Sequence, residues 1–314
     1  MATVLITGGT GSLGTALTKY LLAQREQHTI RIFSRDELKQ EAMKKAIPDK
    51  RVRYLLGDVR DYPRVKRAVR GCDAVIHAAA LKIIPAGEYN PNETIKTNVG
   101  GSNNVIEACI EAGVKRLVCV SSDKAVAPVN LYGATKMCME KLATLASQYS
   151  NETDIVTVRY GNVIGTRASI LTTLKAMAAS GSIKITHAEM TRFWITMKQA
   201  CDFVTTALWH GESGAVYIPK LRSTYVEDLC KTLYPQTPIE YIDIRPGDKV
   251  HEWMSNEYEV LEDAGWAHVI RLKGHMPGSW VWRQTPYSSE HSIVSAASLL
   301  ADPEFADEVT RAAA

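Results

Sequence analysis

Short apolar runs alternate with amphipathic stretches along the first half of the chain. Runs that are apolar throughout are typical of strands buried in a parallel sheet, and the stretches between them carry apolar residues at helical spacing. This pattern predicts six strands, at residues 3–8, 30–34, 52–58, 74–80, 116–122 and 154–165. It predicts helices between them at residues 13–25, 37–46, 64–70, 93–112 and 132–149.

The alternation of strand and helix indicates an α/β protein with a Rossmann-type, doubly wound parallel sheet. After about residue 165 the alternation gives way to shorter elements that are separated by prolines. We therefore expect a main nucleotide-binding domain at residues 1–165 and a smaller C-terminal, substrate-binding lobe at 166–190 and 218–314. The segment 191–217 is expected to return to the main domain.

Composition and charge narrow the class of protein. With 46% hydrophobic and 23% charged residues the chain is typical of globular proteins, and a formal net charge of +3 does not suggest a nucleic-acid partner. No apolar stretch approaches the ~18 residues that a membrane span needs, and a strand predicted from residue 3 leaves no room for a signal peptide. The six cysteines lack CxxC pairs and the eight histidines lack metal-ligand spacing. We therefore expect reduced cysteines, no metal and a cytoplasmic location.

A glycine-rich loop follows the first predicted strand. The segment TGGTGSLG places three glycines at GxxGxxG spacing between a strand and a helix. Glycines at this point let the backbone approach a pyrophosphate, which then lies at the positive end of the helix. The loop therefore predicts a dinucleotide site, to which we assign Gly8, Thr10, Gly11, Ser12, Leu13 and Gly14.

The residues after the second predicted strand bear on which dinucleotide binds. Enzymes that prefer NAD place a carboxylate there for the ribose hydroxyls, whereas this chain has Ser34 and Arg35 in the segment FSRDELK. Arg35, together with Lys39, can hold a 2′-phosphate, so we predict NADP in preference to NAD. Asp36 is close enough to leave a different register open.

Two further segments are candidates for the cofactor site. Asp58 and Val59, in GDVRD, suit a contact with the edge of the adenine, although a turn at the strand end explains them equally well. Ala78, Ala79 and Ala80 follow the fourth predicted strand. Their small side chains leave room for the nicotinamide ribose and the diphosphate.

The segment SSDKAVAPVNLYGATK, residues 121–136, carries the candidate chemistry. Asp123 and Lys124 follow a predicted strand, at the edge where ligands of doubly wound sheets bind. Tyr132 and Lys136 stand four residues apart and so share one helix face. A lysine ammonium beside a phenol favours the phenolate, which can take a proton from a sugar hydroxyl while hydride leaves the same carbon. A chance YxxxK in a surface helix and a surface ion pair are the alternatives.

Several strings taken together resemble one family. In order along the chain they are SRDELKQ, GDVRD, HAAALK, EYNPNETIKTNVGG, SSDKAVAPVNLYGATK, VRYGNVIG, MTRFWIT and RPGDKVHEWM. In these segments the chain is similar to the inverting UDP-N-acetylglucosamine 4,6-dehydratases of the extended short-chain dehydrogenase/reductase superfamily. It departs from the family pattern at Ser122, at residues 167–170 and at Gly87. The last two departures lie near the expected sugar site and leave the choice of sugar open.

The resemblance implies a redox-neutral lyase reaction on a UDP-sugar, with Ser122, Asp123, Lys124, Tyr132 and Lys136 as the catalytic residues. Tyr132 would take the C4 proton, and the resulting 4-ketone would acidify C5. Lys124, if burial leaves it partly neutral, would remove the C5 proton while Asp123 protonates the leaving C6 hydroxyl. Ser122 would position the sugar. The phenol of Tyr132 favours inversion at C5, because retaining relatives tend to carry methionine there.

The resemblance also implies substrate ligands and an assembly. The ligands assigned are Lys82, Asn162, Arg167, Arg245 and Glu252. Arginine suits a diphosphate because its fork binds two oxygens at once. For Glu252 the start of a helix remains an alternative to a contact with the uridine ribose, and Arg192 can be structural or a ligand. We expect a homo-oligomer, either a dimer or a larger assembly.

Other functions remain open from the sequence. A UDP-sugar 4-epimerase, or a dehydratase that retains the C5 configuration, would use Tyr132 and Lys136 on the same fold. An epimerase, however, has no evident need for Asp123 beside Lys124. A cofactor-sensing regulator would keep the glycine loop but usually lacks the Tyr/Lys pair, which this chain has.

Overall fold

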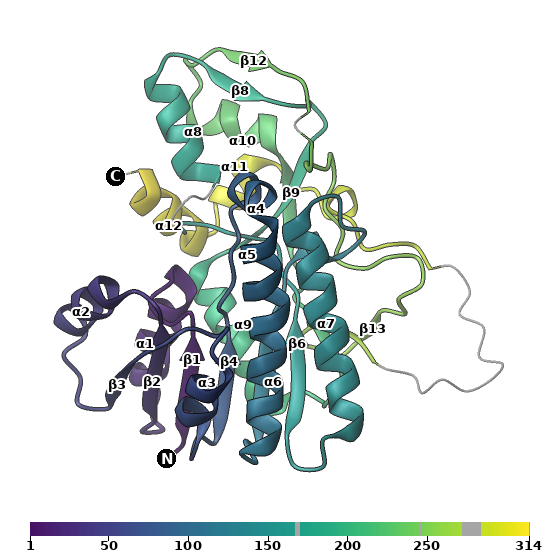
Figure 1. Ribbon diagram of the computed structural model, residues 1–314. Coiled ribbons are helices and arrows are strands. Elements are labelled where there is room, and N and C mark those ends of the chain that lie inside the picture. The colour runs from purple at the N-terminus through teal and green to yellow at the C-terminus, as the bar shows by residue number, and fades with distance from the viewer. Residues whose placement is uncertain (167–169, 245, 272–283, 314) are drawn as a thin grey trace.

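The computed structural model describes residues 1–166, 170–244, 246–271 and 284–313. Its largest sheet has nine strands in the order β13-β14-β10-β6-β5-β4-β1-β2-β3 (Figure 1). These strands are β1 (Thr3–Thr7), β2 (Thr29–Ser34), β3 (Val52–Leu56), β4 (Ala74–His77), β5 (Arg116–Val120), β6 (Asp154–Val158), β10 (Val216–Ile218), β13 (Glu262–Asp263) and β14 (His268–Ile270). The strands from β3 across to β10 are parallel, and β14 pairs antiparallel with both β10 and β13.

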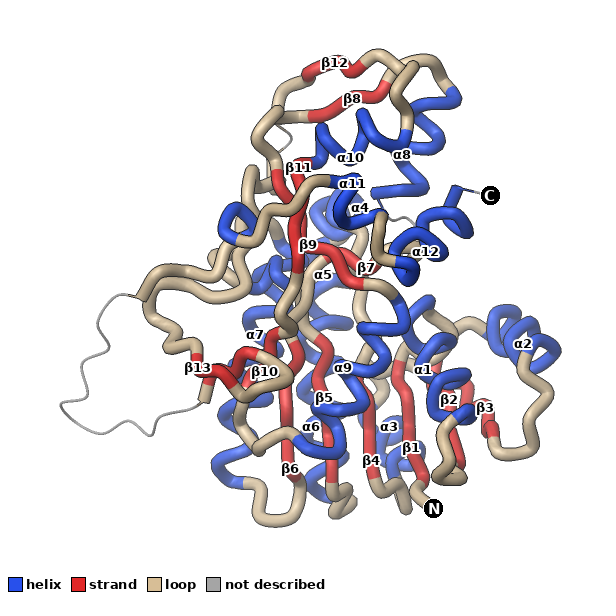
Figure 2. The backbone as a smooth tube through the Cα atoms, turned by 180° about the vertical axis from the view of Figure 1, so that it is seen from behind, coloured by secondary structure: helices blue, strands red, loops and turns tan. Residues whose placement is uncertain are grey.

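Helices cover both faces of this sheet. On one face α3 (Tyr62–Val69), α6 (Gly101–Glu111) and α7 (Leu131–Tyr149) pack on the apolar side chains of the central strands. On the other face α1 (Ser12–Ala23) and α9 (Met197–His210) do the same, as the view from behind shows (Figure 2). The predicted α/β, Rossmann-type doubly wound sheet is therefore confirmed.

The six predicted strands correspond to β1 through β6, with two differences in detail. The strand predicted at 154–165 ends at Val158, and Asn162–Val163 form β7 in another sheet. The helix predicted at 93–112 is α5 (Pro91–Ile95), a π-helical turn (Lys96–Gly100) and α6 in succession. The extra helix α4 (Ile84–Tyr89) and the short helix α2 (Glu37–Ala46) complete this half.

A smaller lobe lies beyond the carboxyl ends of the parallel strands (Figure 1). A three-stranded sheet has the order β11-β9-β7, and a two-stranded sheet pairs β12 with β8. The strands are β8 (Ile183–Ile185), β9 (Thr191–Ile195), β11 (Arg222–Tyr225) and β12 (Ile239–Tyr241), and the helices are α8 (Ile170–Ala179), α10 (Val226–Leu233), α11 (Ala296–Leu300) and α12 (Pro303–Ala313). Trp194, Leu229 and Phe305 are among the buried residues of one core cluster here.

The segments that form the main sheet are not all those that the sequence assigned to the main domain. In the segment 191–217, α9 packs on the main sheet and β10 begins at its edge, but β9 pairs with β7 and β11 instead. Both β13 and β14, which the sequence assigned to the smaller lobe, extend the main sheet. They do so because residues such as Val269 complete the core beside β10. This contact is long-range, and strands of two or three residues are too short to be predicted from their own sequence.

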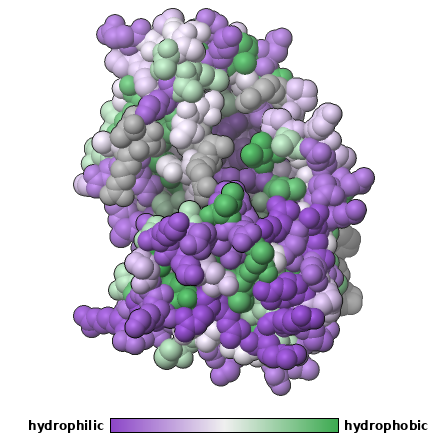
Figure 3. Space-filling model, turned by 60° about the vertical axis from the view of Figure 1, so that its left-hand side comes forward, coloured by the Kyte–Doolittle hydropathy of each residue, from purple (hydrophilic) through white to green (hydrophobic). Residues whose placement is uncertain are grey.

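The character of the surface, the helices and the cysteines is as follows from the described residues. On the face shown in Figure 3, hydrophilic residues dominate and hydrophobic residues occur in small separate groups. Within the described residues, no helix combines the length and apolar character needed to cross a bilayer. All six cysteines are free thiols, and five of them are buried.

Candidate active site

The glycine loop between β1 and α1 lies at the carboxyl edge of the sheet and packs against the residues after β4. Gly8 has a φ of +65°, and a Cβ there would lie 2.9 Å from the backbone of Ala79. A Cβ at Gly14 would lie 2.6 Å from the Cα of Gly9. Side chains are therefore excluded at both positions by close backbone contacts, as a cradle for a phosphate group requires.

Helix α1 begins at this loop without a side-chain cap. Its N-cap residue is Gly11, and among the described residues no side chain forms a capping hydrogen bond at this end. Thr10, Ser12 and Leu13 flank this start, so their backbone N–H groups are close to the carboxyl edge of the sheet. The positive end of the helix dipole is thus available to an anion.

The residues after β2 lie at the position that distinguishes NADP from NAD. The structure has the cation of Arg35 there, and the nearby carboxylate of Asp36 is engaged in other contacts. Asp36 is the N-cap of α2: it accepts a hydrogen bond from the Lys39 backbone N–H at 2.9 Å and pairs with the Lys39 ammonium at 2.7 Å. Arg35 is exposed, and its guanidinium lies 3.7 Å from Asp58. Ser34 is buried and accepts a hydrogen bond from Gln40.

Asp58 and Val59 lie beside this position at the end of β3. Arg60 donates to Asp58 through its backbone N–H and its guanidinium, at distances of 2.7 to 2.9 Å. Burial opposes ionisation, but these hydrogen bonds outweigh it and lower the pKa of Asp58. Val59 is buried against Gly101, where a Cβ would lie 2.5 Å from a Val59 methyl carbon.

The candidate catalytic segment begins where β5 ends. Ser122 caps a 3₁₀ turn (Asp123–Ala125), and its hydroxyl donates to Asp123 Oδ1 at 2.7 Å. The Lys124 ammonium donates to the same oxygen at 3.1 Å. Asp123 is fully buried, and its Oδ2 has no hydrogen-bond partner among the described residues. Burial raises the pKa of Asp123 although the charge of Lys124 opposes this rise.

A glycine brings α7 onto this turn. Gly133 is so close to the turn that a Cβ would lie 2.1 Å from the Lys124 carbonyl oxygen. Asn130 caps α7 by accepting a hydrogen bond from the Gly133 N–H at 2.8 Å and donates to the Gly247 carbonyl at 2.8 Å. Tyr132, in the first turn of α7, therefore lies close to Ser122, which lowers the pKa of its phenol.

The electrostatic effect on Tyr132 differs from the predicted one. Burial raises the pKa of Tyr132 to about 12, while the charge of Lys124 and the hydrogen bond from Ser122 lower it. Lys136 instead donates to the Val120 carbonyl at 2.7 Å, and burial lowers its pKa to about 8. In this structure the lysine that favours the phenolate is therefore Lys124, because Lys136 points to the end of β5.

The protonation of Lys124 also differs from the expectation. Its ammonium lies 3.1 Å from Asp123 and 3.2 Å from Glu252. Burial disfavours the charged form, but the two carboxylates outweigh it and raise the pKa of Lys124. Burial therefore does not leave Lys124 partly neutral in this structure.

The residues assigned to the substrate are dispersed. Lys82 is exposed in the segment between β4 and α4, and Asn162 lies in β7, where its Oδ1 is buried and lacks a hydrogen-bond partner within the described residues. Arg167 and Arg245 lie outside the described residues. Glu252 lies in an irregular segment rather than at a helix start.

Arg192 is held by the backbone around it. Its guanidinium donates to the carbonyls of Thr191, Val250 and Lys249 at 2.7 to 3.0 Å, and the side chain is buried. Sequence reasoning did not pair it with Glu252, whose carboxylate lies 3.8 Å away. Because the two residues come from β9 and from a later irregular segment, no local pattern could reveal this contact.

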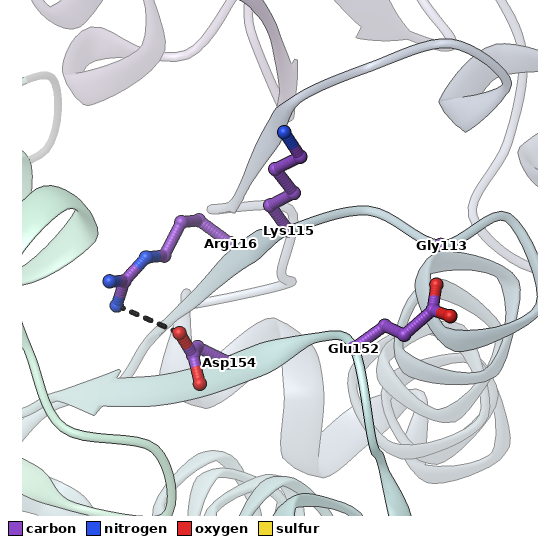
Figure 4. A pocket seen from close by; sticks show the side chains of 5 residues that line it. All are labelled: Gly113, Lys115, Arg116, Glu152 and Asp154. Atoms are coloured by element: carbon purple, nitrogen blue, oxygen red, sulfur yellow. Dashed lines mark ion pairs between the residues drawn. The ribbon is translucent and has the colours of Figure 1, made fainter.

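A surface pocket at the other end of the sheet is separate from these residues. It is lined by Gly113, Lys115, Arg116, Glu152 and Asp154 (Figure 4). Arg116 and Asp154, which are 3.2 Å apart, begin β5 and β6 and so lie at the amino ends of the strands. The glycine loop and the Asp123 turn lie at the carboxyl ends, where ligands of doubly wound sheets bind.

Comparison with known proteins assigns the family. Residues 4–273 match the family described as polysaccharide biosynthesis protein. The chain belongs to this family. An inverting UDP-N-acetylglucosamine 4,6-dehydratase of Campylobacter jejuni strain 81-176 is 46% identical over 255 residues, which cover 80% of this chain and 76% of the relative. The resemblance found in the sequence is thereby confirmed for this member of the polysaccharide biosynthesis family.

Two further comparisons place this family member among its relatives. A UDP-glucose 4-epimerase of Rickettsia akari is 37% identical over 284 residues, covering 87% of this chain and 83% of the relative. The X-ray structure of Pen from Bacillus thuringiensis superposes with a TM-score of 0.86 at 32% identity, covering 97% of this chain and 98% of the other. The fold is thus shared over nearly the whole chain.

Proposed function

We propose that the chain is a UDP-N-acetylglucosamine 4,6-dehydratase that inverts C5 and yields a UDP-4-keto-6-deoxy-hexosamine. The observation that carries the proposal is the buried Asp123 with the Lys124 ammonium 3.1 Å away. Elimination of water needs such an acid and amine together, whereas 4-epimerisation does not. The higher identity to the Campylobacter dehydratase than to the Rickettsia epimerase supports the same choice.

The residues at the carboxyl edge fit a nicotinamide dinucleotide. Gly8 and Gly14 keep side chains out of the loop, and the start of α1 presents backbone N–H groups to which an anion can bind. When bound, the nicotinamide would accept a hydride from C4 of the sugar and return it to C6. Ala78 to Ala80, Tyr132 and Lys136 border the position that we assign to the nicotinamide ribose.

The first proton transfer in this mechanism belongs to Tyr132. Its phenolate would take the proton of the C4 hydroxyl as C4 is oxidised to a ketone. The Lys124 charge favours that phenolate, against the burial that holds the pKa at about 12. Ser122 donates its hydroxyl proton to Asp123 and would help to position the sugar.

The elimination belongs to Asp123 and Lys124. Ser122 and Lys124 both donate to Asp123 Oδ1, which leaves Oδ2 to hold a proton. Transfer of a proton from the Lys124 ammonium to Asp123 would first give the neutral amine and the neutral acid. From Oδ2 the proton would then pass to the C6 oxygen, which leaves as water, while the neutral amine of Lys124 removes the proton from C5. Reprotonation of C5 from the opposite face would give the inverted product.

Incubation of the purified protein with UDP-N-acetylglucosamine tests the proposal. Mass spectrometry is expected to show a product lighter by one water, whereas a 4-epimerase product keeps the mass of the substrate. Proton NMR in D₂O is expected to show deuterium at C5 with the configuration inverted. A product of unchanged mass would contradict the dehydratase, and a product with the D-gluco arrangement at C5 would contradict inversion.

The choice of NADP over NAD is tested at Arg35. Its guanidinium is exposed, and the neighbouring Asp36 is already hydrogen-bonded as the N-cap of α2; both observations support binding of a 2′-phosphate. Arg35→Ala is expected to weaken NADP binding by about tenfold or more, the scale of one charged hydrogen bond, and to leave NAD binding nearly unchanged. Calorimetric titration with each dinucleotide measures both constants.

Arg53→Ala is the matched control for Arg35, since Arg53 is an exposed arginine of β3 whose guanidinium donates to the carbonyls of Lys50 and Val52. It is expected to change neither constant. Tighter binding of NAD than of NADP by the wild-type protein would overturn the cofactor assignment.

A further inference from the structure

Glu252 and Asp123 hold the Lys124 ammonium between them. The ammonium lies 3.1 Å from Asp123 Oδ1 and 3.2 Å from Glu252 Oε1. Glu252 is only 3% exposed, although it comes from the irregular segment between β12 and β13 and not from the catalytic window. Two carboxylates from distant parts of the chain therefore share one buried amine.

The position of Glu252 is fixed by several contacts. Its backbone N–H donates to Ser289 Oγ at 2.9 Å. Besides Lys124, its carboxylate faces Arg192 and Lys249, each at 3.8 Å. These cations outweigh the effect of burial and keep the pKa of Glu252 low.

The remaining charged groups near Glu252 face elsewhere. The neighbouring His251 forms a hydrogen bond with Thr191 at 2.8 Å and lies 3.7 Å from Glu290. The Lys249 ammonium also donates to the Val126 carbonyl, at 2.6 Å. Glu252 is thus an ionised carboxylate whose charge acts on Lys124 and, across it, on Asp123.

These contacts do not suit a ligand of the uridine. A ribose ligand must present its carboxylate to the substrate, whereas the Glu252 carboxylate is buried among three cations of the chain itself. We propose, on the basis of the dehydratase function proposed above, that Glu252 is a positioning residue that holds Lys124 and sets the protonation of the Asp123–Lys124 pair.

The protons of the proposed reaction balance without Glu252. Asp123 gives one proton to the departing C6 oxygen and becomes a carboxylate, and Lys124 takes the C5 proton and becomes an ammonium. Transfer of one proton from Lys124 to Asp123, across the 3.1 Å contact, restores the neutral acid and the neutral amine. The proton that Tyr132 takes from the C4 hydroxyl is released to solvent, and one proton from solvent is added to C5, which closes the cycle. Glu252 neither gains nor loses a proton, and its role is electrostatic.

The sign of its effect follows from its charge. A carboxylate next to an acid disfavours ionisation of that acid, and next to an amine it favours the ammonium. Glu252 therefore raises the pKa of both Asp123 and Lys124. Removing its charge lowers both, so both limbs of the pH profile move in the same direction, to lower pH.

The test compares Glu252→Gln with the wild-type protein. The glutamine keeps the shape and removes the charge, so both limbs of the kcat/KM profile for UDP-N-acetylglucosamine are expected to shift down by about 0.5 pH unit or more. KM at the optimum and the calorimetric affinity for UDP are expected to stay within about threefold. Glu290→Gln, which removes an exposed carboxylate of the same lobe, is expected to leave the profile in place.

Glu252→Asp keeps the experiment decisive if the glutamine variant does not fold. It retains the charge but shortens the side chain by one methylene and so lengthens the distance to Lys124, and kcat is therefore expected to fall by about tenfold while both limbs stay at their wild-type pH. Weaker UDP binding with an unmoved profile would overturn the proposal and make Glu252 a uridine ligand. A wild-type protein that releases no water would instead refute the dehydratase function itself.

Discussion

Replacing Asp123 with asparagine is expected to lower the turnover of UDP-N-acetylglucosamine by about a hundredfold or more. Asparagine keeps the size of the side chain and can accept the hydrogen bonds that Ser122 and Lys124 donate to Oδ1. It places an amide at Oδ2, however, which cannot supply the proton that the leaving C6 hydroxyl needs. Losing a general acid typically costs two to four orders of magnitude in rate.

The measurement is kcat for release of water, with the calorimetric affinity for UDP as the check on folding. Asp263→Asn is the matched control, because Asp263 is an exposed carboxylate of β13 paired with Lys220. It is expected to leave kcat unchanged. Lys124→Ala is expected to match the loss seen with Asp123→Asn, since it removes the base for C5. Near-normal turnover in either variant would remove that residue from the mechanism.

The sequence predicts the parallel half of the sheet well because its signal is local. Each strand from β1 to β6 coincides with a short, mainly apolar run of the sequence, and the helices between them carry apolar residues at helical spacing. The last three strands on this side of the sheet, β10, β14 and β13, have only two or three residues, which is too short to show a period. They form because β10 pairs with β6 and residues such as Val269 of β14 complete a core, and that cause lies outside their own sequence.

The same distinction applies to the site. Ser122 and Tyr132 come together as the sequence suggests, because a strand end and the next helix start are neighbours in a doubly wound sheet. Protonation was not predictable in the same way. Lys124 keeps its proton because two carboxylates flank it, Asp123 beside it and Glu252 from a much later segment, and Lys136 donates to the Val120 carbonyl.

Replacing Arg159 with methionine is expected to lower the free energy of unfolding by about 3–5 kcal/mol. Arg159 follows β6 and is 2% exposed, and its guanidinium donates to Glu140 of α7 at 2.6 and 3.0 Å. It also donates to Glu259 at 2.9 Å and to the Met254 carbonyl at 2.6 Å. Removing this cation leaves the buried Glu140 and the partly buried Glu259 without their shared guanidinium, which costs far more than the intact network contributes.

Urea unfolding measures this loss, and two further variants identify its cause. Arg271→Met removes an arginine that also bridges two glutamates, Glu212 and Glu262, but at the surface, so its effect is expected to be much smaller. Adding Glu140→Gln to Arg159→Met is expected to recover a large part of the loss, because it removes one of the uncompensated charges. A loss no larger than that of Arg271→Met would contradict the assignment.

The Arg159 network also connects stability to the site. Its carboxylate partners come from α7, which carries Tyr132, and from the segment that follows Glu252. Loss of the cation therefore loosens α7, which packs on the Lys124 turn at Gly133, and the segment that carries Glu252, so kcat is expected to fall in the Arg159 variant even where the protein remains folded. Wild-type kcat in the folded fraction would show that α7 and the Glu252 segment hold their places independently of Arg159.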